Sequence, residues 1–190
     1  MIGASARPSH SLAQWLPLGV DPMPDENTTP GGPVGDLVRA VVGPEGAELM
    51  EEMAKDPAAF LNTPRVPDDA GEYAEGIAAI LARIPPGWGR WIGCGKGWYP
   101  LLLETDQKLA ALDPEYLVHQ VKEKFGGLRF YHQFVTEGAD YHAGGAIEVE
   151  AERKSFTICE VCGEPGQLRD GGWRQTLGEL HAEGRGAIRD

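Results

Sequence analysis

The segment that decides the fold spans residues 116–134 and reads YLVHQVKEKFGGLRFYHQF. Apolar residues recur on both sides of the Gly126-Gly127 pair, and many of them are β-branched or aromatic, the types enriched in strands. Consecutive glycines can adopt the positive φ angles of a tight two-residue turn. The pattern therefore predicts a β-hairpin with its turn at Gly126 and Gly127.

Helical patterns surround this hairpin. The spacing of apolar residues, with caps and prolines at the segment ends, predicts helices over residues 36–42, 49–53, 57–61, 73–84, 100–112 and 146–158. Asp36 and Asp56 are expected as N-caps, and Gly43-Pro44 is expected to separate the first two helices. The fold class is therefore α+β: a helical N-terminal half, then a helix, the β-hairpin, a helix and a zinc-knuckle-like C-terminal segment.

Composition divides the chain into four stretches. Residues 1–35 hold six prolines and five glycines and are expected to be irregular or flexible, with the apolar group at Trp15 able to dock on the rest. Residues 36–86 form a helical region. A Gly/Trp loop, a helix, the hairpin and a further helix occupy residues 87–158, with a loop expected over 136–145. Residues 159–190 form the zinc-knuckle-like segment.

Charge and cysteine content exclude several classes of protein. The 190 residues carry 29 acidic and 17 basic side chains, a net charge of −12, which excludes a broad basic surface for non-specific binding to phosphate backbones. Three cysteines make a disulfide framework improbable and favour a reducing compartment. We expect no signal peptide and no membrane anchor, and therefore a cytoplasmic protein.

The C-terminal segment contains the sharpest chemical motif. Cys159 and Cys162 are three residues apart, and Gly163 permits the tight turn that lets both thiolates face one tetrahedral ion. The second half of such a site is expected 15–20 residues later, where Gly178 and His181 stand at the spacing of a ligand pair. The sequence thus predicts a metal site with Cys159, Cys162 and His181 as ligands and Gly178 in the place of a fourth.

Three interpretations of this motif remain open. The first is a structural zinc ion with a fourth donor borrowed from elsewhere, the candidates being Glu179, Cys94, His132 and His142. The second is a metal-free relic held by packing. The third is an open catalytic zinc ion with bound water, since three protein ligands plus water is also a catalytic arrangement.

Several motifs together resemble a known family. They are Gly97-Trp-Tyr-Pro-Leu-Leu102, Gln120-Val-Lys-Glu-Lys-Phe-Gly-Gly-Leu-Arg-Phe-Tyr131 and Cys159-Glu-Val-Cys-Gly-Glu-Pro-Gly-Gln-Leu-Arg169. Over residues 95–183 the chain resembles a family of small bacterial and phage proteins that has no established activity. The resemblance implies a bacterial or phage origin and a C-terminal zinc ribbon in which the family has cysteine at the position of Gly178. It implies no reaction.

Two further stretches are candidates for binding. Lys122, Lys124 and Arg129 surround the hairpin turn and form a locally positive stretch, which is either a solvated strand face or a surface for phosphates or carboxylates. Trp88, Trp91 and Trp98 lie in the glycine-rich loop and are typical of protein interfaces. In the same loop, residues 93–97 lack the spacing of a phosphate-binding P-loop, so they form either a packed loop or a simple anion site at Lys96.

These features favour a non-enzymatic binding protein that contacts a protein partner through the hairpin and the aromatic loop. One version is an inhibitor of a host defence complex, with the acidic surface mimicking nucleic acid. The first alternative is a nucleic-acid-binding zinc-knuckle protein using Lys122, Lys124 and Arg129. The second is a metal-dependent enzyme with an open site at Cys159, Cys162 and His181.

Overall fold

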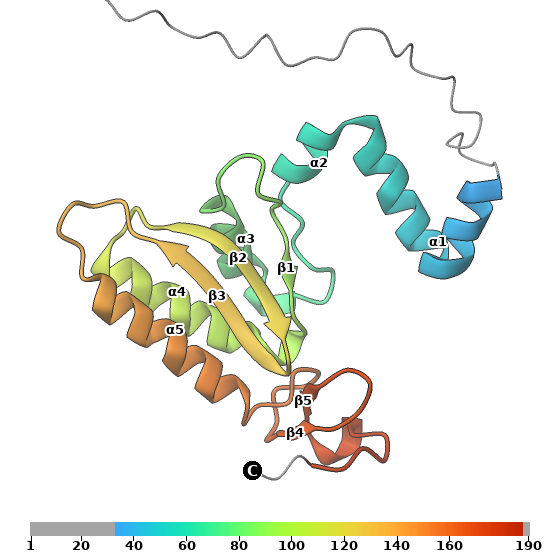
Figure 1. The fold of residues 1–190 in the computed structure, drawn as a ribbon. Coiled ribbons are helices and arrows are strands. Elements are labelled where there is room, and N and C mark those ends of the chain that lie inside the picture. Colours follow the sequence, from blue (N-terminus) through green and yellow to red (C-terminus); the bar gives the residue numbers. More distant parts are fainter. Residues whose placement is uncertain (1–32, 188–190) are drawn as a thin grey trace, which may run out of the picture. The chain divides into compact units, whose positions relative to one another are not determined.

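A computed structural model describes residues 33–187 of the chain (Figure 1). The chain divides into two units, one ending at Glu51 and the other beginning at Glu52. Most of the segment expected to be irregular, including Trp15, lies outside the described residues. Its last three residues, 33–35, are helical.

The first helix contains the interruption that the sequence predicts. α1 (Pro33–Lys55) is kinked at Gly43, whose φ of 76° and ψ of 173° are not helical, directly before Pro44. The left-handed φ suits glycine, and the proline ring cannot continue the preceding hydrogen-bond ladder. The helix begins three residues before Asp36, so the expected N-cap at Asp36 is wrong.

The second unit contains the remaining elements, which confirm the α+β class. They are α2 (Pro57–Asn62), a 3₁₀ turn (Gly71–Tyr73), α3 (Ala74–Ala82), β1 (Ile92–Gly93), a 3₁₀ turn (Lys96–Trp98), α4 (Tyr99–Leu112), β2 (Leu117–Lys124), β3 (Gly127–Gln133), α5 (Tyr141–Ser155), β4 (Gln167–Arg169), β5 (Gln175–Leu177) and a 3₁₀ turn (Glu179–His181). At α2 the predicted cap is confirmed, since the Asp56 carboxylate accepts a hydrogen bond from the Ala59 amide at 2.9 Å.

The predicted hairpin is confirmed, but its turn is one residue earlier than expected. Phe125 (φ 56°) and Gly126 (φ 80°) are the two turn residues, and Gly127 already pairs with Lys124 in the ladder. Two consecutive left-handed residues are the signature of a type I′ turn, which matches the twist of the strands. Phe125 therefore occupies a conformation that usually belongs to Asn or Gly.

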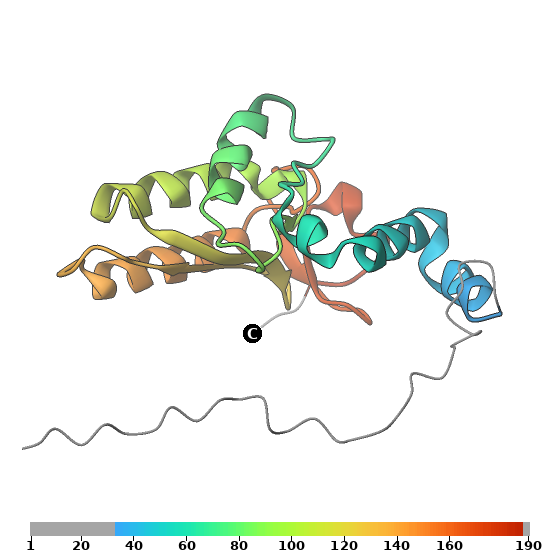
Figure 2. The same ribbon diagram turned by 90° about the horizontal axis from the view of Figure 1, so that it is seen from above.

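The main sheet has three strands in the order β1-β2-β3. β2 and β3 are antiparallel, whereas β1 pairs with β2 in parallel, with Ile92 opposite Val121. β1 has only two residues, too few for an alternating pattern, so the sequence did not predict it. α4 and α5 lie side by side on one face of the sheet (Figures 1 and 2), and α3 packs on α4.

α5 begins five residues earlier than expected. The Asp140 carboxylate caps it by accepting from the Ala143 amide at 2.9 Å, so the predicted loop over 136–145 is wrong in its second half. The Gly144-Gly145 pair is typical of a loop, but Gly144 lies in α5 and allows the helix to pack closely against the neighbouring chain. A Cβ at this position would come within 2.6–2.8 Å of the His132 and Phe134 side chains of the neighbouring strand segment.

The core lies between the helices and the sheet. Its fully buried members include Ile77, Ile80 and Leu81 of α3, Leu102 and Leu109 of α4, Val118 of β2 and Leu128 of β3. The opposite face of the sheet carries exposed side chains such as Gln120 and its cross-strand partner Tyr131. Among the described helices, none has the length and apolarity needed to cross a membrane.

Candidate metal centre

The two cysteines lie on a turn that follows α5. The Cys159 amide donates to the Glu164 carbonyl at 2.7 Å, and the Gly163 amide donates back to the Cys159 carbonyl at 2.8 Å. Gly163 has φ 82°, the left-handed conformation expected of a glycine that closes such a turn. The predicted role of Gly163 is thereby confirmed, and both thiols are held on one short loop.

His181 joins them from the other end of the C-terminal segment. It lies in the 3₁₀ turn after β5, and one ligand atom from each of Cys159, Cys162 and His181 lies within 4.8 Å of the other two. The Cys159 Sγ to His181 Nδ1 distance is 3.5 Å. Tetrahedral zinc with ordinary Zn–S and Zn–N bonds separates its sulfur and nitrogen ligands by about 3.6 Å. The three predicted ligands could therefore hold a metal ion, and the sulfur–nitrogen distance is the one that zinc would require.

Gly178 lies next to Cys159 of this group. A Cβ built at Gly178 would lie 3.8 Å from Cys159 Sγ and 3.0 Å from the Pro165 carbonyl oxygen. Its φ of −72° and ψ of 166° are open to any residue. A side chain at position 178 would therefore lie beside the Cys159 thiol, but glycine supplies no ligand.

None of the four candidate fourth donors belongs to the described metal-ligand group. Glu179 pairs with Arg169 at 2.6 Å, and its side chain is 80% exposed. His132 is bound through Nδ1 to Glu148 of α5 at 2.6 Å. His142 is an exposed residue of the first turn of α5, and Cys94 lies in the glycine-rich loop.

The surroundings of Cys159 favour the thiolate, the form that binds metals. Burial of the thiol raises its pKa, but the backbone N–H groups of Gly178, Cys162 and Val161 more than offset this effect and lower the pKa to about 7. For Cys94, in contrast, burial strongly raises the pKa, and the nearby Glu160 carboxylate adds to the effect. Only the first of these two thiols is suited to metal binding at neutral pH.

The glycine-rich loop packs against the cysteine turn. The Gly97 amide donates to the Glu160 carbonyl at 2.8 Å, and the Gly95 amide donates to the Glu160 carboxylate at 3.1 Å. A Cβ at Gly97 would overlap the Cys159 carbonyl. The packed-loop interpretation is thereby confirmed, since two of the amides on which an anion site would depend already have partners.

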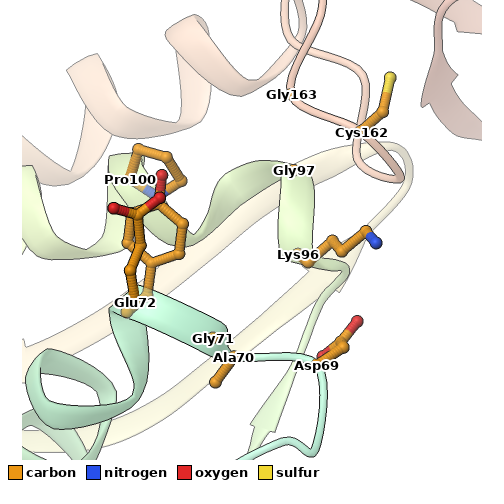
Figure 3. Close-up of a pocket in the computed structure, with 10 residues that line it drawn as sticks. Asp69, Ala70, Gly71, Glu72, Lys96, Gly97, Pro100, Cys162 and Gly163 are labelled. Carbon is orange, nitrogen blue, oxygen red and sulfur yellow. The ribbon is translucent and has the colours of Figure 1, made fainter.

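A shallow pocket of about 250 Å³ adjoins this contact and is lined by Asp69, Glu72, Lys96 and Cys162 among others. Figure 3 shows Lys96 between Asp69 and Cys162, with the Cys162 sulfur directed away from Glu72. Cys159 and His181 do not line it, and Asp69 already accepts a hydrogen bond from Tyr99 at 2.9 Å. The pocket is smaller than the 300–1,000 Å³ typical of small-molecule sites.

The predicted partner-binding tryptophans divide into two kinds. Trp88 is 57% exposed and packs at a tilt against His119 with the ring centroids 4.5 Å apart, and Trp91 is 39% exposed. Trp98 is fully buried, and its indole N–H donates to the Ile158 carbonyl at 2.9 Å. The prediction that Trp98 contacts a partner is therefore wrong, because this side chain joins the glycine-rich loop to the C-terminal segment.

The predicted basic residues of the hairpin divide in the same way. Arg129 forms an ion pair with Glu152 of α5 at 2.5 Å and is largely covered, so it is a structural contact rather than a free charge. Lys122 and Lys124 line a groove whose other wall carries Trp173 and Arg174. These last two residues were not predicted, although a Trp-Arg pair in an aliphatic-poor segment is a usable signal.

Comparison of the chain with protein-family models, with curated proteins and with solved structures found no significant match. The resemblance to a family of bacterial and phage proteins stays a prediction.

Proposed function

We propose that the chain is a non-enzymatic binding protein whose C-terminal module, residues 156–187, is ordered by a structural zinc ion. The observation that carries the proposal is the convergence of the Cys159, Cys162 and His181 ligand atoms within 4.8 Å. Zinc supplies a cross-link between the two ends of the module. Gly178 leaves the fourth position to a ligand from outside this set.

The composition of the module supports a structural role for the metal. Its buried apolar residues are few, namely Cys159, Leu177 and Ala182, and they share the interior with polar Glu160, Arg169 and Thr176. Apolar burial of this extent does not offset the entropy of ordering some thirty residues. Small modules of this kind are commonly stabilised by a metal ion.

The surface beside the module supports a binding role. Thr176 donates through its hydroxyl to the Gly126 carbonyl at 2.6 Å, so the module is anchored to the turn of the β2–β3 hairpin. Figure 1 shows β4 and β5 at this end of the sheet. Exposed aromatic and basic side chains of the hairpin turn and of the module lie together at this end of the sheet. The narrower version, an inhibitor of a host defence complex, stays a prediction.

Metal analysis tests the proposal. The purified chain should contain about one zinc ion, and the Cys159→Ser and His181→Ala variants should lose most of it. Cys94→Ser is the matched control, since it removes a thiol outside the group and should leave the zinc content unchanged. Fewer than about 0.1 zinc ions per wild-type chain would overturn the metal part of the proposal.

Hydrogen exchange tests whether the metal is structural. Chelation should expose the amides of β4 and β5, because the module loses its cross-link, whereas the amides of α4 should stay protected. Unchanged protection of β4 and β5 after zinc removal would contradict a structural role and favour the relic interpretation.

A further inference from the structure

A groove of about 690 Å³ separates the hairpin turn from the loop between β4 and β5. The side chains that define this basic groove are Lys122, Glu123, Lys124, Phe125, Trp173 and Arg174. Its volume lies within the 300–1,000 Å³ typical of ligand sites. The two walls are about 50 residues apart in sequence and are joined by the hydrogen bond from the Trp173 indole N–H to the Glu123 carboxylate, 3.0 Å long.

The cations of the groove are free of carboxylates. Lys122, Lys124 and Arg174 form no ion pair with any residue in the described part of the chain. Several basic side chains elsewhere in the described residues are ion-paired, as Lys108 and Lys154 are with Glu104. In the whole chain acidic residues outnumber basic residues by 29 to 17. The three unpaired cations around this groove therefore give it a charge opposite in sign to that of the chain.

The single acid of the groove is already engaged. Glu123 accepts hydrogen bonds from the Trp173 indole and from the Gly126 amide at the turn. Three cations against one carboxylate leave an excess of positive charge. Glu123 also fixes the indole of Trp173 by its polar edge.

Two aromatic side chains stand at the rims of the groove. Phe125 is 63% exposed and Trp173 is 65% exposed, values unusual for large apolar residues. The Lys124 ammonium lies 5.3 Å from the Phe125 ring centroid, which places a cation beside the ring. Aromatic rings beside free cations are the combination that binds bases by stacking and phosphates by charge.

The backbone conformation of Phe125 is also unusual. A non-glycine residue with φ 56° is strained, and the usual residues at this turn position are Asn, Asp or Gly. Stability alone would therefore disfavour both the conformation and the exposure of this ring. Residues that retain such strain are concentrated at functional sites.

We infer that the basic groove binds single-stranded nucleic acid. Phe125 and Trp173 stack on bases, while Lys122, Lys124 and Arg174 hold phosphates. A duplex would need the broad basic surface that a net charge of −12 excludes, and an acidic peptide would make no use of two exposed rings. The inference rests on the proposed function, because the zinc-ordered module forms one wall.

Binding of labelled oligonucleotides tests the inference. Fluorescence anisotropy with oligothymidine and oligouridine of about 12 nucleotides is measured with the full chain between about 50 and 200 mM salt. The triple variant Lys122→Gln/Lys124→Gln/Arg174→Gln should bind at least ~10-fold more weakly. Its salt dependence should lose a slope of about 2, since each lost phosphate contact on a single strand removes about 0.7.

A matched control separates local contacts from net charge. Lys55, Lys96 and Arg153 are exposed, lie outside the groove and form no ion pair with a described residue. Changing all three to Gln alters the total charge equally and should weaken binding less than ~2-fold. Equal losses in the two triple variants would overturn the inference.

Stacking is tested at Trp173. Trp173→Ala should weaken oligonucleotide binding by roughly 5-fold or more, whereas Trp173→Phe should restore most of it, because a ring remains. A polyglutamate peptide that binds as tightly as the oligonucleotides, and equally well to Trp173→Ala, would overturn the inference in favour of an acidic protein partner.

Zinc content distinguishes the two proposals. A chain with about one zinc ion that binds neither oligonucleotide overturns this inference and leaves the proposed function standing. A chain that lacks zinc yet binds through the groove overturns the metal part of the proposed function and supports the groove. Both measurements are made on the same preparation.

Discussion

The helix–sheet body, residues 57–155, and the C-terminal module, residues 156–187, are stabilised differently. The body buries a continuous apolar core in which Leu102, Leu109 and Val118 are fully covered. The module buries as many polar as apolar residues and is joined internally by short hydrogen bonds and the predicted metal ligands. The first therefore depends on the hydrophobic effect, and the second on directed bonds that a single change can remove.

The largest expected effect is the loss of stability caused by a cavity in the core of the helix–sheet body. Leu102→Ala should lower the free energy of unfolding by about 2–5 kcal/mol, because Leu102 is fully buried. The matched control is Leu180→Ala in the module, where the side chain is 92% exposed and its loss should change stability by less than about 0.5 kcal/mol. Urea denaturation followed by circular dichroism measures both. Equal effects would contradict the assignment of the apolar core to the body.

The module should respond to a restored ligand. Gly178→Cys places a Cβ 3.8 Å from Cys159 Sγ and should raise zinc affinity at least ~10-fold, measured by competition with a chelating dye. The Pro165 carbonyl, 3.0 Å from that Cβ, must move by a few tenths of an ångström. Gly178→Ala introduces the same Cβ without the thiol. Equal affinities in the two variants would show that position 178 does not face the metal.

Acid should lower the stability of the helix–sheet body, because it protonates the Asp113 carboxylate. Its buried carboxylate accepts from the Thr136 amide at 3.0 Å and hydroxyl at 2.7 Å and from the Val135 amide at 2.7 Å, and these bonds lower its pKa from 3.8 to about 2. A lowered carboxyl pKa stabilises the fold above about pH 4, and the stabilisation is lost as the pH falls towards about 2. Asp113→Asn should therefore be less stable than wild type at neutral pH, with the difference shrinking over that window. Thermal unfolding at several pH values measures this difference, and a gap that is constant with pH would contradict it.

The smallest expected effect is a gain of stability at the hairpin turn. Phe125→Asn replaces a strained residue with one that tolerates a positive φ, and should raise the free energy of unfolding by about 1 kcal/mol. Phe125→Ala removes the same ring and keeps the strain, so it serves as the control. If the two variants are equally stable, the gain in stability does not come from relief of backbone strain at position 125. Both variants should bind oligonucleotides more weakly than wild type.

Local patterns predicted most of the elements of the second unit. The Asp56 cap, the Pro100 start of α4 and the hairpin all depend on residues close in sequence, and each is confirmed. The errors have a common cause. Gly144 resembled a loop residue but serves the packing of α5 on Phe134, and Trp98 resembled an interface residue but fills the core. Side-chain type does not reveal which distant element covers it.

The sequence by itself determined the α+β class and the three metal-ligand candidates, because hydrophobic period and the Cys159-Cys162-Gly163 spacing are local properties. Only the tertiary structure decided which charges are free. It pairs Arg129 with Glu152 and places Trp173 beside Glu123, and so moves the basic site from the hairpin alone to a groove between the hairpin and the module. Contacts across fifty residues depend on how whole elements pack, which no short stretch of sequence specifies.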